Sequence, residues 1–347
     1  MSCYRTGTGR MEAMEDGMGL TELGPVGVGD PSTEGTYVCR FSPHLVEVAR
    51  QELQEKPEWR LRDIQALRDM LKEHPEIPAP TDDGFLLRFL RARKFDYDKA
   101  LLLIDNYYKC RRVWPDVFVN FYPSSVRHVL EAGVVTALPQ PDAQGRRIIV
   151  LRPGLWNPAV APATDMLRVL YMTLEMLVRQ EETQVCGLVV LADYAGLGLA
   201  HASHLGPAFA RRVATVLQDA FPVRVKAVNI FNEPIIMKAI FAIVKPFLKE
   251  KLQKRYYFHG SDLSSLHRSL PPGVLPNEYG GAAGPLDAQR WALTLLDWEP
   301  FFLREFGGPV AIAPTPALGT DGQQLQIGTS RAASQYSDEA EEASAKL

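Results

Sequence analysis

The sequence contains few cysteines and no long hydrophobic run. The cysteines, Cys3, Cys39, Cys110 and Cys186, are scattered, without a Cys-x-x-Cys pair or a metal-type spacing to histidine. This usage is typical of free thiols in a reducing compartment. No apolar run approaches the roughly 18 residues of a membrane-spanning helix, and the first residues show no charged-then-apolar targeting pattern. We therefore expect a cytoplasmic protein whose contact with membranes is peripheral.

An excess of positive charge is also lacking. The 38 Lys and Arg residues are balanced by 41 Asp and Glu residues, which gives a net charge of -3. Attraction to nucleic acid or acidic lipid would therefore have to come from a local patch. The basic stretches lack the aromatic side chains on which single-stranded nucleic acids stack, so no nucleic-acid partner is expected.

The common catalytic and nucleotide-binding motifs are lacking as well. There is no phosphate-binding Gly-x-x-x-x-Gly-Lys loop and no Gly-x-Ser-x-Gly elbow, and His201 stands where a dinucleotide loop in GLGLAHASHLG would need glycine. A hydrolase triad of Asp193, Ser203 and His204 stays open as an alternative. His201 and His204 have no evident third metal ligand. We expect no catalytic residue, no metal and no cofactor.

The chain has 347 residues, enough for one large domain or two of ordinary size. Its two ends have the composition of disordered segments, and the C-terminal one finishes in the acidic SDEAEEASAKL. We expect five parts: a disordered tail (1–36), a helical lobe (37–118), a larger domain (119–283), a helical extension (284–312) and a disordered acidic tail (313–347).

Helical signals dominate residues 41–118. Pro57 is expected in the first turn of a helix, and Asp82 is expected to cap the helix of DDGFLLRFLRARKF. The next helix is expected to begin at a cap formed by Asp96 or Asp98. The apolar positions at helical spacing are Ile64, Leu67, Leu71, Phe85, Leu86, Phe89, Leu90, Ala100, Leu103, Ile104 and Tyr107.

From about residue 130 onward, short β-rich runs alternate with helical patterns. The β-rich runs are VVTAL (134–138), RIIVLR (147–152), GLVVLADY (187–194), VKAVNIF (225–231) and the shorter YYFHG (256–260). The helical patterns are 164–180, 205–219 and 233–253. Continuously apolar inner strands are typical of a sheet covered on both faces. The alternation predicts an α/β domain with a largely parallel sheet.

Residues 232–255, NEPIIMKAIFAIVKPFLKEKLQKR, combine a wide apolar helix face with many lysines. Pro246 should break this helix. The pattern is typical of an interfacial helix, and a core helix with a solvated edge is the alternative. Arg224 and Lys226 lie two residues apart, on one face of the preceding strand. Together with the basic residues of RFLRARKF they would form an anion-binding patch beside an apolar helix, which suits a phosphorylated lipid headgroup.

Several motifs together resemble the CRAL-TRIO (Sec14-like) lipid-transfer family: FLLRFLRARKFDYDKA, EETQVCGLVVLADYAG, LQDAFPVRVKAVNIFNEP, KPFLKEKL and LPNEYGG. The resemblance covers about residues 45–300 and is strongest to the tocopherol-carrying branch. It implies an all-helical N-terminal lobe followed by a CRAL-TRIO lipid-binding domain, in which helices flank a mostly parallel sheet and a mobile gate helix closes a cavity. Residues 232–255 would be the gate. The implied protein is a monomeric, non-enzymatic carrier of a hydrophobic lipid, such as a tocopherol-like isoprenoid, that visits phosphoinositide-containing membranes, with endosomes as one candidate.

The resemblance also implies two sets of site residues. The phosphoinositide-binding positions, called the basic patch below, are Arg93, Arg224, Lys226, Lys251 and Arg255, while Leu102 stands where the branch has one more basic residue. The implied pocket residues are Leu170, Thr173, Leu174, Val185, Leu188, Val190, Val213, Leu217, Phe221, Val225, Val228, Ile240, Phe241 and Val244. Leu170 and Leu174 replace serines that face the ring end of tocopherol in the branch. Plain core packing is the alternative for each pocket residue.

Two other functions stay open at this stage. One is a membrane-recruited regulatory or adaptor protein that uses the lipid as a sensor input. The other is a phospholipid-exchange protein, since the resemblance does not identify the lipid.

Overall fold

The computed structural model describes residues 37–235 and 237–307. The chain divides into two units, 1–310 and 311–347, and the second lies wholly outside the described residues. The tails expected to be disordered, 1–36 and 313–347, also lie outside them.

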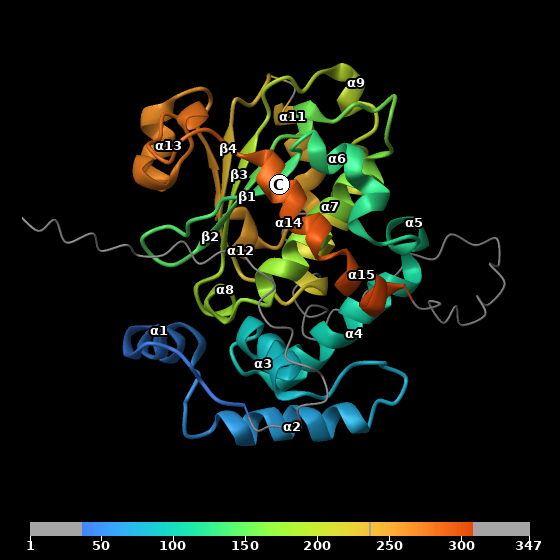
Figure 1. The fold of residues 1–347 in the computed structure, drawn as a ribbon, viewed down its shortest axis with the longest axis vertical. Coiled ribbons are helices and arrows are strands. Elements are labelled where there is room, and N and C mark those ends of the chain that lie inside the picture. Colours follow the sequence, from blue (N-terminus) through green and yellow to red (C-terminus); the bar gives the residue numbers. More distant parts are fainter. Residues whose placement is uncertain (1–36, 236, 308–347) are drawn as a thin grey trace, which may run out of the picture. The chain divides into compact units, whose positions relative to one another are not determined.

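The N-terminal lobe is helical, as predicted (Figure 1). Its helices are α1 Pro43–Leu53, α2 Arg60–Lys72, α3 Asp83–Ala92, α4 Tyr97–Val113 and α5 Pro115–Phe118. The predicted caps are confirmed: the side chain of Asp82 accepts a hydrogen bond from Phe85 N at 2.8 Å, and Asp96 accepts one from Lys99 N at 3.1 Å.

The expected position of Pro57 was wrong. It lies in a turn, and α2 begins only at Arg60. The physical reason is local: the segment before α2 inserts the carboxylate of Glu55 into the interior, where Arg60 Nε donates to it at 2.6 Å.

The remainder of unit 1 is built on a five-stranded sheet in the order β1-β2-β3-β4-β5. The strands are β1 Val135–Ala137, β2 Arg147–Leu151, β3 Leu188–Asp193, β4 Val225–Phe231 and β5 Tyr256–Phe258. Strand β1 pairs antiparallel with β2, and all other neighbours are parallel. The predicted α/β class with a largely parallel sheet is therefore confirmed.

Both faces of the sheet are covered, which explains why the inner strands are continuously apolar. Figure 1 shows α13 Leu263–Ser269 on one side of the sheet, with α7 Ala163–Val178 and α14 Ala288–Asp297 on the other. Neighbouring residues of β2 divide between the two sides: Ile148 and Val150 pack with Leu266 of α13, whereas Ile149 packs in the cluster that contains α7. The remaining helices are α6 Arg127–Glu131, α8 Glu181–Cys186, α9 Leu199–Ala202, α10 Pro207–Thr215, α12 Glu250–Gln253 and α15 Glu299–Phe306.

The segment expected to form the gate is helical but interrupted. It contains α11 Met237–Val244, a single 3₁₀ turn Lys245–Phe247 and α12. Pro246 lies in the 3₁₀ turn, so the predicted break is confirmed. No helix in the described ranges has the length and apolar character needed to cross a membrane.

Candidate functional site

The basic patch forms at the edge of the sheet where two parallel strands begin. Arg224 immediately precedes β4 and Arg255 immediately precedes β5, and the two strands are paired. The backbone of Arg224 is fixed by the neighbouring strand, since Leu188 N donates to its carbonyl at 2.9 Å. Gly187 permits this approach: a Cβ on it would lie 2.5 Å from the same carbonyl oxygen, and its φ of +87° favours glycine.

The five predicted cations lie close enough to influence one another. Arg93 reaches this region from the end of α3, and one of its guanidinium nitrogens donates to Gln218 O at 2.8 Å. Lys251 is exposed on α12. Partial burial lowers the pKa of Lys251, and nearby positive charges lower it further, namely those of Arg255, Lys94, Arg224 and Arg93. The structure thus brings the whole basic patch together and adds Lys94 beside it.

An acidic residue that was not expected from the sequence lies within the patch. Both Arg224 and Lys226 donate to Glu52 Oε2, which also shows that they point to the same side of the strand. Partial burial alone would raise the pKa of Glu52, but hydrogen bonds from Lys226 and Arg224 lower it below its ordinary value. No local pattern could have revealed this contact, because Glu52 is 172 positions from Arg224.

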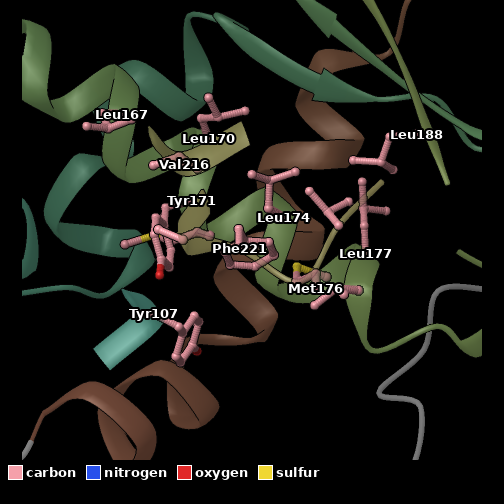
Figure 2. Close-up of a cluster of buried hydrophobic side chains, with 14 of the residues drawn as sticks. Tyr107, Leu167, Leu170, Tyr171, Leu174, Met176, Leu177, Leu188, Val216 and Phe221 are labelled. Carbon is pink, nitrogen blue, oxygen red and sulfur yellow. The ribbon is translucent and has the colours of Figure 1, made fainter. Parts of the chain in front are cut away.

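The implied pocket residues fall mostly into one apolar cluster around α7, part of which is shown in Figure 2. Seven of them are buried within this cluster: Leu170, Leu174, Leu188, Val190, Phe221, Val225 and Val228. Another four are only partly buried and pack against it: Val213, Leu217, Phe241 and Val244. The partly buried ones come from α10 and the π-helical turn Val216–Ala220 on one side and from α11 on the other.

Three of the implied pocket residues do not add a described apolar side chain to this cluster. Val185 packs in a separate cluster with Ala49 and Leu53 of α1. The hydroxyl of Thr173 is already used, since Trp291 Nε1 donates to it at 3.3 Å. The side chain of Ile240 lies outside the described part of the structure.

The side chain of Gln218 holds the break between α11 and α12. The side chain of Gln218 donates to Phe247 O at 2.9 Å and accepts from Lys249 N at 2.6 Å, on either side of the break between α11 and α12. The backbone carbonyl of the same residue accepts the hydrogen bond from Arg93. Gln218 therefore connects Arg93 of the basic patch with the break between α11 and α12.

The alternative catalytic triad is not assembled. Asp193 accepts hydrogen bonds from Tyr279 OH at 3.0 Å and from Asn232 Nδ2 at 2.9 Å, and the Ser203 hydroxyl donates to Ala200 O at 2.9 Å. None of these three hydrogen bonds involves a histidine. Within 37–235 and 237–307, no group of acidic, histidine or cysteine side chains is arranged to hold a metal ion.

Comparison with known proteins fits this arrangement. The CRAL/TRIO domain family matches residues 131–281, and the Pinta-like UBA domain family matches residues 56–127. The chain is 56% identical over 275 residues to the alpha-tocopherol transfer protein-like proteins of Homo sapiens and Mus musculus, covering 79% of this chain and 80% of each relative.

A more distant relative also matches most of the chain. The clavesin-2 of Rattus norvegicus is 39% identical over 262 residues, covering 75% of this chain and 80% of that protein. A solved structure, that of Sfh5, covers 76% of this chain and 99% of its own at 14% identity and a TM-score of 0.43, a likeness too low to support an argument. On the sequence relationships, the chain belongs to the CRAL/TRIO family, whose members bind and transfer lipids.

Proposed function

We propose that this protein carries one hydrophobic lipid beneath α11 and transfers it between membranes, and that the basic patch docks it on phosphoinositide. The observation that carries the proposal is the seam between α10 and α11. Along this seam Val213, Leu217, Phe241 and Val244 stay only partly buried although they pack against the main apolar core. A seam of this kind can open to an apolar ligand by moving α11, without unfolding the sheet.

The seam lies next to a cationic surface, and this arrangement suits release at a membrane. A lipid with about 20 buried CH₂ groups gains roughly 16 kcal/mol on leaving water, so escape through water is very slow. Exchange with a bilayer replaces one apolar environment by another and has a small net cost. Each Lys or Arg held near an anionic surface contributes about 1 kcal/mol of attraction. A patch beside the hinge can therefore bias the gate toward its open form.

Exposed apolar residues at the opposite edge of the sheet suit a membrane that lies along the proposed gate. Leu155, Leu199 and Ile235 follow the carboxyl ends of β2, β3 and β4, and they are 46%, 76% and 94% exposed. Because α11 and α12 connect the end of β4 to the start of β5, the gate runs from this apolar edge back to the basic patch. A membrane lying along the gate would meet apolar residues at one end and cations at the other.

A tocopherol-like isoprenoid is the ligand we propose, on the similarity to alpha-tocopherol transfer protein-like proteins. Leu170 and Leu174 place apolar side chains, where the branch has serines, in the cluster that contains Phe221 (Figure 2). A buried hydroxyl without a partner costs about 1–3 kcal/mol, so we expect ligands without a hydroxyl at this end to bind more tightly than tocopherol itself.

The proposal also covers the oligomeric state, the location in the cell and the domain boundaries. The protein acts as a monomer in the cytoplasm and associates peripherally with membranes, endosomes among them. The helical lobe and the lipid-binding domain meet near residue 118, and the C-terminal extension begins near residue 284.

The test combines identification of the cargo with a transfer assay. Native mass spectrometry of the purified full chain, followed by organic extraction, is expected to show one bound hydrophobic lipid. That lipid, fluorescently labelled, should move from donor to acceptor vesicles faster when the acceptors contain phosphatidylinositol bisphosphate. Protein that carries no lipid and moves none would overturn the proposal in favour of an adaptor, and a phospholipid cargo would make it a phospholipid-exchange protein.

A further inference from the structure

Glu52 occupies two of the cations on which the proposed docking depends. Its Oε2 accepts from both Arg224 and Lys226, and the side chains of these two residues are only 10% and 18% exposed. The carboxylate itself is more accessible, with 42% of the Glu52 side chain exposed. An incoming anion can therefore reach this site from solvent, but it finds the two cations already paired.

The helix that carries Glu52 is held in place by other contacts. Ala49 and Leu53, four residues apart on α1, are 1% and 0% exposed and pack against Val185 and Cys186 of α8. The ion pairs of Glu52 are thus not needed to dock α1. The carboxylate can release its partners while the helix stays on the domain.

The competition depends on the charge of the incoming anion. A single carboxylate carries one negative charge, whereas a phosphate monoester carries about -1.5 to -2 near neutral pH and offers three acceptor oxygens. A phosphatidylserine headgroup has a net charge close to -1 and gains little by displacing Glu52. A headgroup with two phosphate monoesters can satisfy both cations better than Glu52 does.

We propose that Glu52 is a specificity-determining residue, an internal competitor that reserves Arg224 and Lys226 for multiply phosphorylated headgroups. This inference rests on the proposed function of the basic patch and deepens it. It assigns to α1 of the helical lobe the task of excluding membranes that are merely acidic.

The test is a vesicle-binding assay with the full chain carrying Glu52→Gln. Phosphatidylcholine vesicles contain either phosphatidylserine or phosphatidylinositol bisphosphate, matched in total charge. Each released cation is expected to increase affinity for the phosphatidylserine vesicles by about fivefold. Affinity for the bisphosphate vesicles should rise less, so the preference for phosphoinositide should fall.

Glu47→Gln is the matched control, because it removes the same charge from the same helix. Among the described residues, the carboxylate of Glu47 pairs with Arg50 and accepts a hydrogen bond from Gln51, and it forms no ion pair with the basic patch. The control should leave the preference unchanged. Equal preferences in Glu52→Gln and Glu47→Gln would overturn the inference.

A second readout uses the wild-type protein and does not depend on a variant that folds. Binding of soluble inositol trisphosphate should raise the pKa of the Glu52 carboxyl toward its ordinary value, as followed by ¹³C NMR, and an unchanged pKa with the compound bound would overturn the inference.

The two proposals can fail separately. If wild-type protein prefers bisphosphate vesicles but Glu52→Gln keeps that preference, only the inference on Glu52 fails. If wild-type protein shows no such preference, both the proposed phosphoinositide docking and the inference on Glu52 fail.

Discussion

Arg91 and Glu55 form a buried two-pronged ion pair between α3 and the segment that follows α1. Arg91 Nε lies 2.8 Å from Glu55 Oε2, a second guanidinium nitrogen lies 2.9 Å from Oε1, and both side chains are 0% exposed. The remaining guanidinium nitrogen donates to Gln184 Oε1 of α8 at 2.8 Å. One arginine thus connects the helical lobe, the turn before α2 and the lipid-binding domain.

We predict that Arg91→Met destabilises the protein by about 3–5 kcal/mol. Removing one partner of a buried pair leaves the other charge without full compensation, which is the costly case. Glu55→Met should cost a similar amount, because it leaves both Arg91 and Arg60 without their carboxylate. The double variant should cost less than the sum of the two, since it leaves fewer unpaired charges. Urea unfolding of the four proteins measures this coupling.

Arg50→Met serves as the control for this cycle. Arg50 is on α1, its side chain is 50% exposed, and its contact with Glu47 is long, at 3.9 Å. An exposed pair of this kind contributes about 0–1 kcal/mol. A strictly additive double variant at Arg91 and Glu55 would show that the buried pair does not act as a unit.

The same carboxylate should make stability depend on pH. Burial alone would raise the pKa of Glu55, but Arg91 and Arg60 lower it below its ordinary value of 4.5. Below pH 4.5 the unfolded chain therefore takes up a proton at this position before the folded protein does. The contribution of Glu55 is fully present above that pH and is lost as the pH falls through the lower folded-state pKa. Urea unfolding at a series of acidic pH values should show a shallower decline for Glu55→Gln than for wild type, and equal slopes would contradict this assignment.

Replacing three cations of the basic patch should separate docking from lipid binding. We predict that Arg224→Ala, Lys251→Ala and Arg255→Ala combined lower phosphoinositide-stimulated transfer by at least tenfold, since each cation contributes about 1 kcal/mol at an anionic surface. The amount of co-purified lipid should not change, because these residues lie outside the apolar cluster. The charge-matched control changes Lys56, Lys72 and Lys99 to alanine, since their ammonium groups contact Trp59, Asp69 and Asp96. A triple variant with wild-type stimulation would exclude the patch as the docking site.

The sequence predicted the sheet and the shared face of Arg224 and Lys226 because both follow from local patterns, whereas the five positions of the basic patch came from the resemblance to the CRAL-TRIO family. Strand runs of β-branched residues and the alternation of Arg224 and Lys226 need no knowledge of the rest of the chain. Glu52 and Gln218 could not be predicted in this way. Their partners depend on how α1 and the π-helical turn dock on the domain, and nothing in their own neighbourhood marks them as exceptional. Val185 shows the same limit: the resemblance implied a pocket residue, but the docking of α1 determines which cluster it joins.

A variant of Gln218 tests whether the basic patch controls the opening of the proposed gate. Gln218→Ala removes both side-chain hydrogen bonds to the break between α11 and α12, the one to Phe247 O and the one from Lys249 N. It keeps the backbone carbonyl that accepts from Arg93, so it separates the break from the basic patch. We expect lipid transfer to vesicles without phosphoinositide to rise several-fold and the stimulation by phosphoinositide to fall. Gln253→Ala is the matched control, because the Gln253 side chain donates to Leu248 O at 2.7 Å and, among the described residues, has no hydrogen bond to a side chain of the basic patch. It should raise basal transfer while preserving the stimulation. If the two variants respond alike to phosphoinositide, Gln218 only fastens the gate and does not couple it to the headgroup.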